Sequence, residues 1–122
     1  MTIEEKCKQL PKIISNAGIT LYPGHYSYPE DVCTFMDKFY ELDLIDQNYL
    51  NHHRNLRECK TKYNKHGYIY EELTLEDLLT ICTYIIRGER FCDGMIDACL
   101  RDGSFQKVVN KLIEGDYKWL KF

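Results

Sequence analysis

The chain lacks the short motifs that mark the common enzyme and metal-binding classes. It contains no GxSxG, P-loop, HExxH or GxGxxG pattern, so the well-marked hydrolases, phosphate-loop enzymes, zinc proteases and dinucleotide enzymes have no support. It contains no CxxC pair, which removes the main evidence for a zinc ribbon or a thioredoxin-like site. It also lacks any uncharged apolar run of about eighteen residues, the length that would predict a membrane span.

An excess of positive charge is missing as well. A net charge of −3 argues against a generally basic nucleic-acid-binding protein, but it leaves room for a local basic patch. The charged N-terminal segment lacks the apolar centre of a secretory signal, so we expect a cytoplasmic protein whose six cysteines are reduced. The best set of metal ligands is His53, Cys59 and His66, and its spacing matches no established site. We therefore expect no metal and no cofactor.

Apolar residues recur at helical spacing along most of the chain. The clearest stripes fall in residues 29–42, 74–90 and 104–115, and Thr74 with Asp77 has the spacing of a helix-capping box. Residues 1–122 are enough for one hydrophobic core and too few for two ordinary domains. The sequence thus predicts an all-α fold, a single compact domain of five or six helices.

The remaining segments are less regular. Thr2 is expected to cap a first helical segment, interrupted by Pro11 and closed by Gly18, and Asp46 to cap another over the residues that follow it. The aromatic stretch between Gly18 and the next helix is predicted to be an ordered loop that its tyrosines anchor to the rest of the protein. Residues 60–72 lose the helical period, so they form either a short extended, hairpin-like insert or a plain connection.

The charged stretch RGERFCDG, residues 87–94, is the first candidate site. Its structural interpretation is a junction between two helices, with the arginines near a helix C-terminus, Glu89 pairing an arginine, Phe91 filling the core and Asp93 capping the next helix. Its functional interpretation is a pocket in which the paired guanidiniums bind a phosphate or carboxylate. The residues proposed for that binding site, with two tyrosines as its walls, are Arg87, Glu89, Arg90, Asp93, Tyr28 and Tyr49.

A second candidate lies between residues 51 and 66, where basic side chains outnumber acidic ones. These cations could bind the phosphates of RNA or DNA, with a tyrosine stacking on a base. The other interpretation is a solvent-exposed helix face, on which basic residues are equally common. The residues of this alternative nucleic-acid site are Arg54, Arg57, Lys60 and Lys62.

The segment LTICTYIIRGERFCDGMIDACLRDGSFQKVVNKL resembles a family of small bacterial and phage-associated proteins known only as a domain of unknown function. The shared core reads LLTYxxRGERFxDG, and the upstream block YPEDVCTFMDKFYELDLIDQNYL is similar to another block of that family. The resemblance runs from about residue 22 onward and leaves residues 51–73 as a variable insert. It implies that residues 87–94 are the family's defining element, and that a regulatory or host–virus role suits the chain better than housekeeping metabolism.

Together these features favour a small cytoplasmic, non-enzymatic binding module. We expect it to engage a protein partner or an anionic small ligand, in a setting of phage–host conflict or regulation. One alternative is an enzyme acting on a phosphorylated or nucleotide substrate, with Glu89 or Asp93 as its general base. The other alternative is nucleic-acid binding through the basic patch within residues 54–65.

Overall fold

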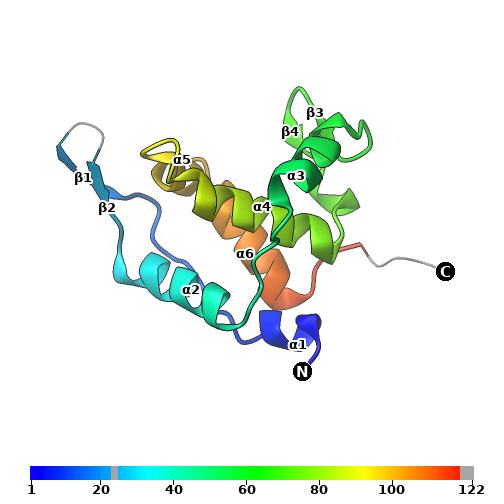
Figure 1. Ribbon diagram of the computed structural model, residues 1–122, viewed down its shortest axis with the longest axis horizontal. Helices are drawn as coiled ribbons and strands as arrows, with labels where there is room; N and C mark the ends of the chain where they lie inside the picture. Colours follow the sequence, from blue (N-terminus) through cyan, green and yellow to red (C-terminus); the bar gives the residue numbers. More distant parts are fainter. Residues whose placement is uncertain (23–24, 119–122) are drawn as a thin grey trace.

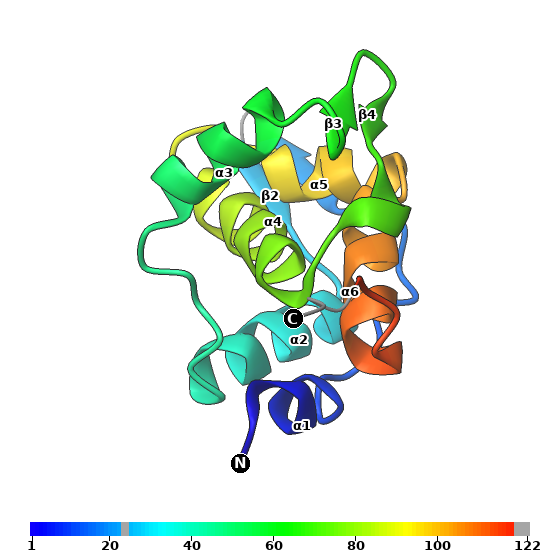
Figure 2. The ribbon, with the colours of Figure 1, turned by 90° about the vertical axis from the view of Figure 1, so that its right-hand side faces the viewer.

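Helix α4 (Leu75–Gly88) lies at the centre of the molecule, and three of the other helices pack against it (Figures 1 and 2). The computed structural model describes residues 1–22 and 25–118. Helix α4 (Leu75–Gly88) begins with the predicted capping box, in which Thr74 accepts the Asp77 N–H and Asp77 accepts the Thr74 N–H. Its buried residues face several sides of the helix, as expected of a central element.

The described part of the chain has five further helices. Helices α3 and α6 pack directly against it, α5 joins its C-terminal end to α6, and α1 and α2 lie together at the opposite end (Figure 2). The core includes a cluster of three phenylalanines. The centre of the Phe35 ring lies 5.7 Å from that of Phe39 and 5.6 Å from that of Phe105. The bounds of these helices are α1 Ile3–Cys7, α2 Glu30–Glu41, α3 Tyr49–Glu58, α5 Met95–Arg101 and α6 Ser104–Glu114. The predicted all-α class is confirmed.

Two short antiparallel hairpins complete the described structure. Strands β3 (Tyr63–Asn64) and β4 (Gly67–Tyr68) form the predicted hairpin-like insert, followed by the 3-10 turn η1 (Tyr70–Glu72). Strands β1 (Ile19–Tyr22) and β2 (His25–Ser27) form a hairpin that projects from the body in Figure 1, where the sequence predicts an ordered loop. The loop prediction is wrong. Every β1 side chain is exposed, so the strand has no buried face, and its four residues lie beside two prolines and a glycine that are typical of a loop.

The helix predicted between Pro11 and Gly18 is also absent, although the Thr2 cap of α1 is present. The Asp31 carboxylate accepts the N–H groups of Ile14 and Ser15 at 2.8 and 3.0 Å, and the Ser15 hydroxyl at 2.7 Å. These bonds hold the segment extended, because they satisfy backbone donors that a helix would otherwise satisfy.

Among the described residues no helix is long and apolar enough to cross a membrane. Past α6, the Lys118 N–H donates to the Leu73 carbonyl at 2.8 Å, which joins the end of the described chain to the start of α4.

Candidate functional site

The RGERFCDG stretch is a junction closed by one carboxylate. Helix α4 ends at Gly88, and the side chain of the next residue, Glu89, lies at the N-terminus of α5. Glu89 Oε1 accepts the Ile96 N–H at 2.8 Å and the Tyr28 hydroxyl at 2.9 Å, while Oε2 accepts the Gly94 N–H at 2.9 Å. A carboxylate at this place satisfies helix N–H groups that have no partner within the helix, and it suits the positive end of the helix dipole.

Tyr28 connects the junction to the segment that follows strand β2. Its hydroxyl donates to Glu89 and accepts the Asp97 N–H at 3.3 Å, and burial, followed by the bond to Glu89, raises its pKa. Asp97 in turn accepts the Gly18 N–H at 2.6 Å and the Arg101 Nε–H at 2.8 Å. Tyr28 therefore joins the hairpin base to α5, and does not form a free wall of a pocket.

Several sequence-based predictions for this junction are wrong. Asp93 is exposed and caps nothing, since Gly94 is the N-cap of α5 and Glu89 supplies the carboxylate. Phe91 is 84% exposed and does not fill the core. Glu89 bonds to backbone and tyrosine, not to an arginine. Arg90 is exposed at the surface.

Arg87 and Tyr49 do meet, but inside the packing of α3 against α4. The Arg87 guanidinium carbon lies 6.0 Å from the centre of the Tyr49 ring, and Tyr49 is buried. Arg87 Nε is buried without a hydrogen-bond partner. The junction thus brings together Tyr28 with Glu89, and Tyr49 with Arg87, as two separate structural contacts.

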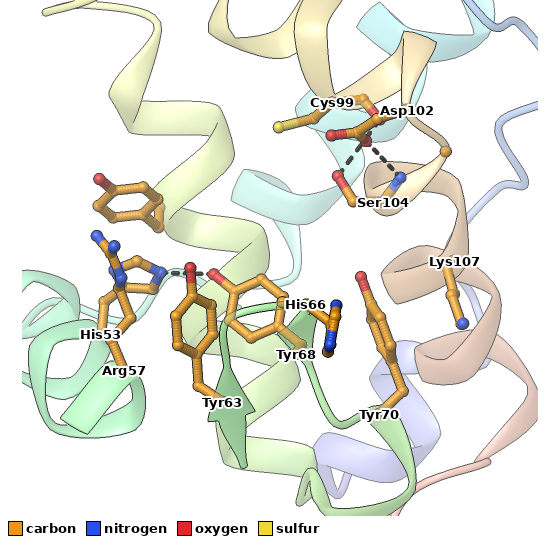
Figure 3. Close-up of a pocket in the computed structure, with 13 residues that line it drawn as sticks. His53, Arg57, Tyr63, His66, Tyr68, Tyr70, Cys99, Asp102, Ser104 and Lys107 are labelled. Atoms are coloured by element: carbon orange, nitrogen blue, oxygen red, sulfur yellow. Dashed lines mark hydrogen bonds between the residues drawn. The ribbon is translucent and has the colours of Figure 1, made fainter. Parts of the chain in front are cut away.

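An open cavity of about 550 Å³ lies elsewhere, between α3, the β3–β4 hairpin and the turn from α5 to α6 (Figure 3). Six aromatic side chains line it: His53, Tyr63, His66, Tyr68, Tyr70 and Tyr84. Three charged side chains line it too: Arg57, Asp102 and Lys107. Figure 3 shows the Tyr70 hydroxyl pointing toward the side of the cavity where Ser104 lies.

The aromatic rings support one another. Tyr68 lies between Tyr63 and Tyr70, with ring centres 5.2 and 6.0 Å apart and edge-to-face geometry on both sides. The His53 ring stacks on Tyr84 at 3.7 Å, and its Nε2 is 2.7 Å from the Tyr68 hydroxyl. This wall is therefore assembled from α3, α4, the hairpin and η1, and each of these five rings contacts a neighbouring ring.

His53 and Tyr68 are both held in their neutral forms at pH 7. Burial, with a smaller contribution from Arg57, lowers the pKa of His53 to about 4. Burial also raises the pKa of Tyr68, and the neighbouring Tyr63 and Tyr70 add to that effect. Because a general acid or base works best with a pKa near the operating pH, this pair suits binding better than proton transfer.

The cations of the cavity lie over aromatic rings. The Arg57 guanidinium carbon is 5.2 Å from the centre of the Tyr63 ring, and Lys107 Nζ is 4.2 Å from that of Tyr70. Such contacts orient a cation without neutralising it. The carboxylate of Asp102 accepts the Ser104 N–H at 2.8 Å.

A second cavity, of about 450 Å³, adjoins the first and shares part of its wall. The residues common to both are His53, Arg57, Tyr63 and Tyr84. The second cavity adds Leu50, Arg54 and Glu58 from α3. We refer to the combined lining of the two cavities as the tyrosine groove.

The predicted basic patch contributes only in part to this groove. Arg54 and Arg57 line it, whereas Lys62 forms an ion pair with Asp77 at 2.7 Å, and Lys60 lines neither cavity. Lys107 was not among the predicted residues, because it lies on α6, far from the patch in sequence. Besides the basic patch, a signal for the groove in the sequence is the density of tyrosines between residues 63 and 70, where the helical period is lost.

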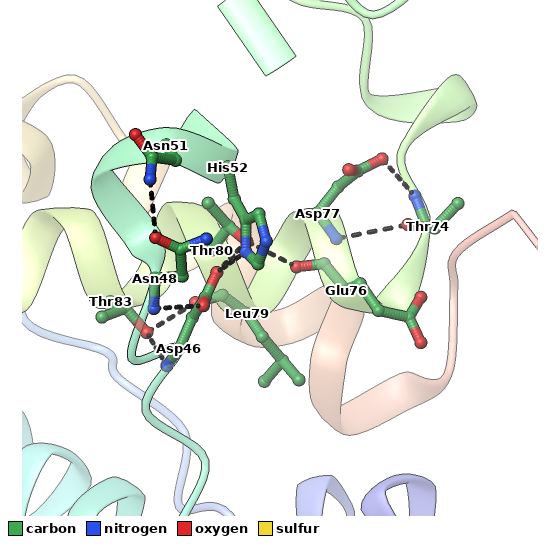
Figure 4. A network of polar contacts seen from close by, with 10 residues as sticks. All are labelled: Asp46, Asn48, Asn51, His52, Thr74, Glu76, Asp77, Leu79, Thr80 and Thr83. Carbon is green, nitrogen blue, oxygen red and sulfur yellow. Dashed lines mark hydrogen bonds and ion pairs between the residues drawn. The ribbon is translucent and has the colours of Figure 1, made fainter. Parts of the chain in front are cut away.

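Helices α3 and α4 are also joined by a polar network around Asp46 (Figure 4). Its carboxylate accepts the Asn48 N–H at 2.9 Å and the Thr80 hydroxyl at 2.7 Å, and contacts His52 Nδ1 at 2.7 Å. The Asp46 N–H donates to the Thr83 hydroxyl at 3.0 Å. The N-cap of α3 is Asn48, so the predicted cap at Asp46 is wrong; Asp46 instead supports the turn before the helix.

Asp46 makes stability depend on pH. Burial acts to raise its pKa, but the hydrogen bonds from Thr80, His52 and Asn48 prevail and lower it below the usual 3.8. The stabilisation is thus present above the unfolded-state pKa and is lost as the pH falls through the folded-state value. We expect urea unfolding to show a smaller loss of stability from about pH 5 to about pH 3 in Asp46→Asn than in the wild type. Asp37→Asn, at an exposed position, is the control; parallel curves for Asp46→Asn and wild type would contradict the assignment.

The sequence profile of a family of unknown function (DUF6508) matches residues 7–115. The chain belongs to this family. The family match spans the junction at residues 87–94 and every residue of the tyrosine groove, so both are parts of the family domain. No curated protein and no solved structure matches the chain.

Proposed function

We propose that this chain is a non-enzymatic binding module and that an anionic ligand binds in the tyrosine groove. The observation that carries the proposal is an open cavity in which tyrosine hydroxyls and two cations, Arg57 and Lys107, share one lining. Ligand sites are typically concave and aromatic, with a few polar groups that converge on the ligand. The groove has this composition, whereas the RGERFCDG junction uses its central carboxylate to close the fold.

The polar groups of the groove suit an oxyanion. Phenol hydroxyls can donate to phosphate or carboxylate oxygens, and the guanidinium and ammonium groups add charge-assisted hydrogen bonds. The Tyr63 ring holds Arg57 from one side, and Tyr70 does the same for Lys107. Cations that are already oriented lose less side-chain entropy when a ligand binds.

The enzyme alternative has less support from the geometry. Glu89, one of its two candidate bases, already accepts three hydrogen bonds, and Asp93 is an exposed residue that lines neither cavity of the groove. His53, the histidine fixed in the wall of the groove, has a lowered pKa that makes it a weak base at pH 7. Engagement of a protein partner and a role in phage–host conflict stay predictions.

Calorimetric titration with pyrophosphate tests the proposal. We expect Arg57→Gln and Lys107→Gln each to weaken binding about tenfold, because each removes one charge-assisted contact. Lys60→Gln is the matched control, since it removes the same charge from an exposed residue outside the groove. Equal losses in Lys60→Gln and Lys107→Gln, or no binding to the wild type, would contradict an anion site in the groove.

A further inference from the structure

We infer that the ligand of the tyrosine groove is a segment of single-stranded nucleic acid, an inference that rests on the proposed function. The two cavities of the groove share four lining residues, so they lie next to each other, and their linings together reach from α3 to the α5–α6 turn. A surface of this extent exceeds what one phosphate group would occupy, and it suits a chain laid across it.

Positive charge is distributed along this surface. Arg54 lies in one cavity, Arg57 in the part that both share, and Lys107 in the other cavity. They come from two different helices, α3 and α6, so the spread results from tertiary packing. Cations placed at intervals along a groove match a ligand that carries a negative charge on every unit, as a nucleic-acid backbone does.

In the part that both cavities share, Arg57 lies over the Tyr63 ring, and the buried His53 covers one face of Tyr84. The flat groups that a ligand can reach between the outer cations are the exposed Arg57 and the partly exposed rings of Tyr63 and Tyr84. Bases stack on tyrosine rings and on guanidinium planes, and this stacking tolerates any base. An acidic peptide gains nothing comparable from these rings. A duplex hides its base faces within its own stack, so a single strand is the better fit.

The carboxylates of the groove limit the electrostatic contribution. Glu58 and Asp102 also line it, against the three cations, and the whole chain carries a net charge of −3. We therefore expect moderate affinity and a shallow salt dependence. With three phosphates contacted, the slope of log K against log salt concentration is about −2, since each contributes about −0.7 for a single strand.

Fluorescence anisotropy with a labelled oligouridylate of about twelve nucleotides tests this inference, a length within the range that such grooves cover. We expect Arg54→Gln and Lys107→Gln each to weaken binding about fivefold, and Lys60→Gln to change it less than about twofold. Arg54 and Lys107 are exposed, so neither substitution disturbs the core. Uridine monophosphate and an oligoglutamate of equal length should both compete poorly.

Three other results would overturn the inference. If pyrophosphate binds through Arg57 and Lys107 but the oligonucleotide binds no better than the mononucleotide, the groove is a small-anion site and the proposed function stands alone. If oligoglutamate competes as well as the oligonucleotide, the ligand is recognised by charge and a protein segment replaces the nucleic acid. If oligonucleotide binding is the same in Arg54→Gln, Lys107→Gln and wild type, it occurs at another surface.

Discussion

Replacing Glu89 by alanine should lower the free energy of unfolding by about 3 kcal/mol, because three donors lose their acceptor together. The N–H groups of Gly94 and Ile96 lose the carboxylate that caps α5, and the Tyr28 hydroxyl loses the carboxylate oxygen to which it donates. Water can reach part of this region and replace some of the bonds, which keeps the loss below the sum of three fully buried donors. Urea unfolding followed by circular dichroism measures the change.

The neighbouring residue provides the control. Arg90→Ala should change the free energy of unfolding by less than about 0.5 kcal/mol, because Arg90 is exposed. Tyr28→Phe should cost about 1 kcal/mol, since it removes the hydroxyl from Glu89 and Asp97 and leaves the ring in place. If Arg90→Ala were as destabilising as Glu89→Ala, the arginine, not the carboxylate, would hold the two helices together.

The helices that could be predicted from the sequence are those whose signals are local. For α4, the Thr74 cap and the apolar stripe after it come from residues a few positions apart. The prediction of a second helical piece before Gly18 failed because the decisive contact is not local. Asp31 on α2 accepts the backbone N–H groups of Ile14 and Ser15. The local spacing of apolar residues cannot reveal that a side chain distant in sequence will replace the hydrogen bonds of a helix.

The candidate site shows the same limit. The sequence favoured RGERFCDG as a binding site because its charged residues are adjacent. In the structure these residues form the junction between α4 and α5. The tyrosine groove combines Arg57 from α3, Tyr84 from α4 and Lys107 from α6, and only the packing of those helices brings the three together. The part of the groove that could be predicted, Arg54 and Arg57, is the part contributed by one helix.

Gly94→Ala should destabilise the protein by about 2–4 kcal/mol, because it combines two unfavourable effects. Gly94 has a φ of +90°, in the left-handed region that a residue with a Cβ adopts only at a cost. A Cβ at this position would also lie 2.8 Å from three atoms of the Tyr26 side chain. These atoms form the outer end of the Tyr26 ring, so the ring must shift away from the turn to make room for the methyl group.

Gly103→Ala separates the two effects. Gly103 is likewise the N-cap of a helix and has a φ of +82°, but a Cβ there would meet nothing within 4 Å. It should therefore cost only about 1 kcal/mol, the conformational share alone. Thermal and urea unfolding of both variants measure the difference. An equal loss in the two would mean that Tyr26 moves away freely, and that the contact between β2 and the junction contributes little to the stability of the fold.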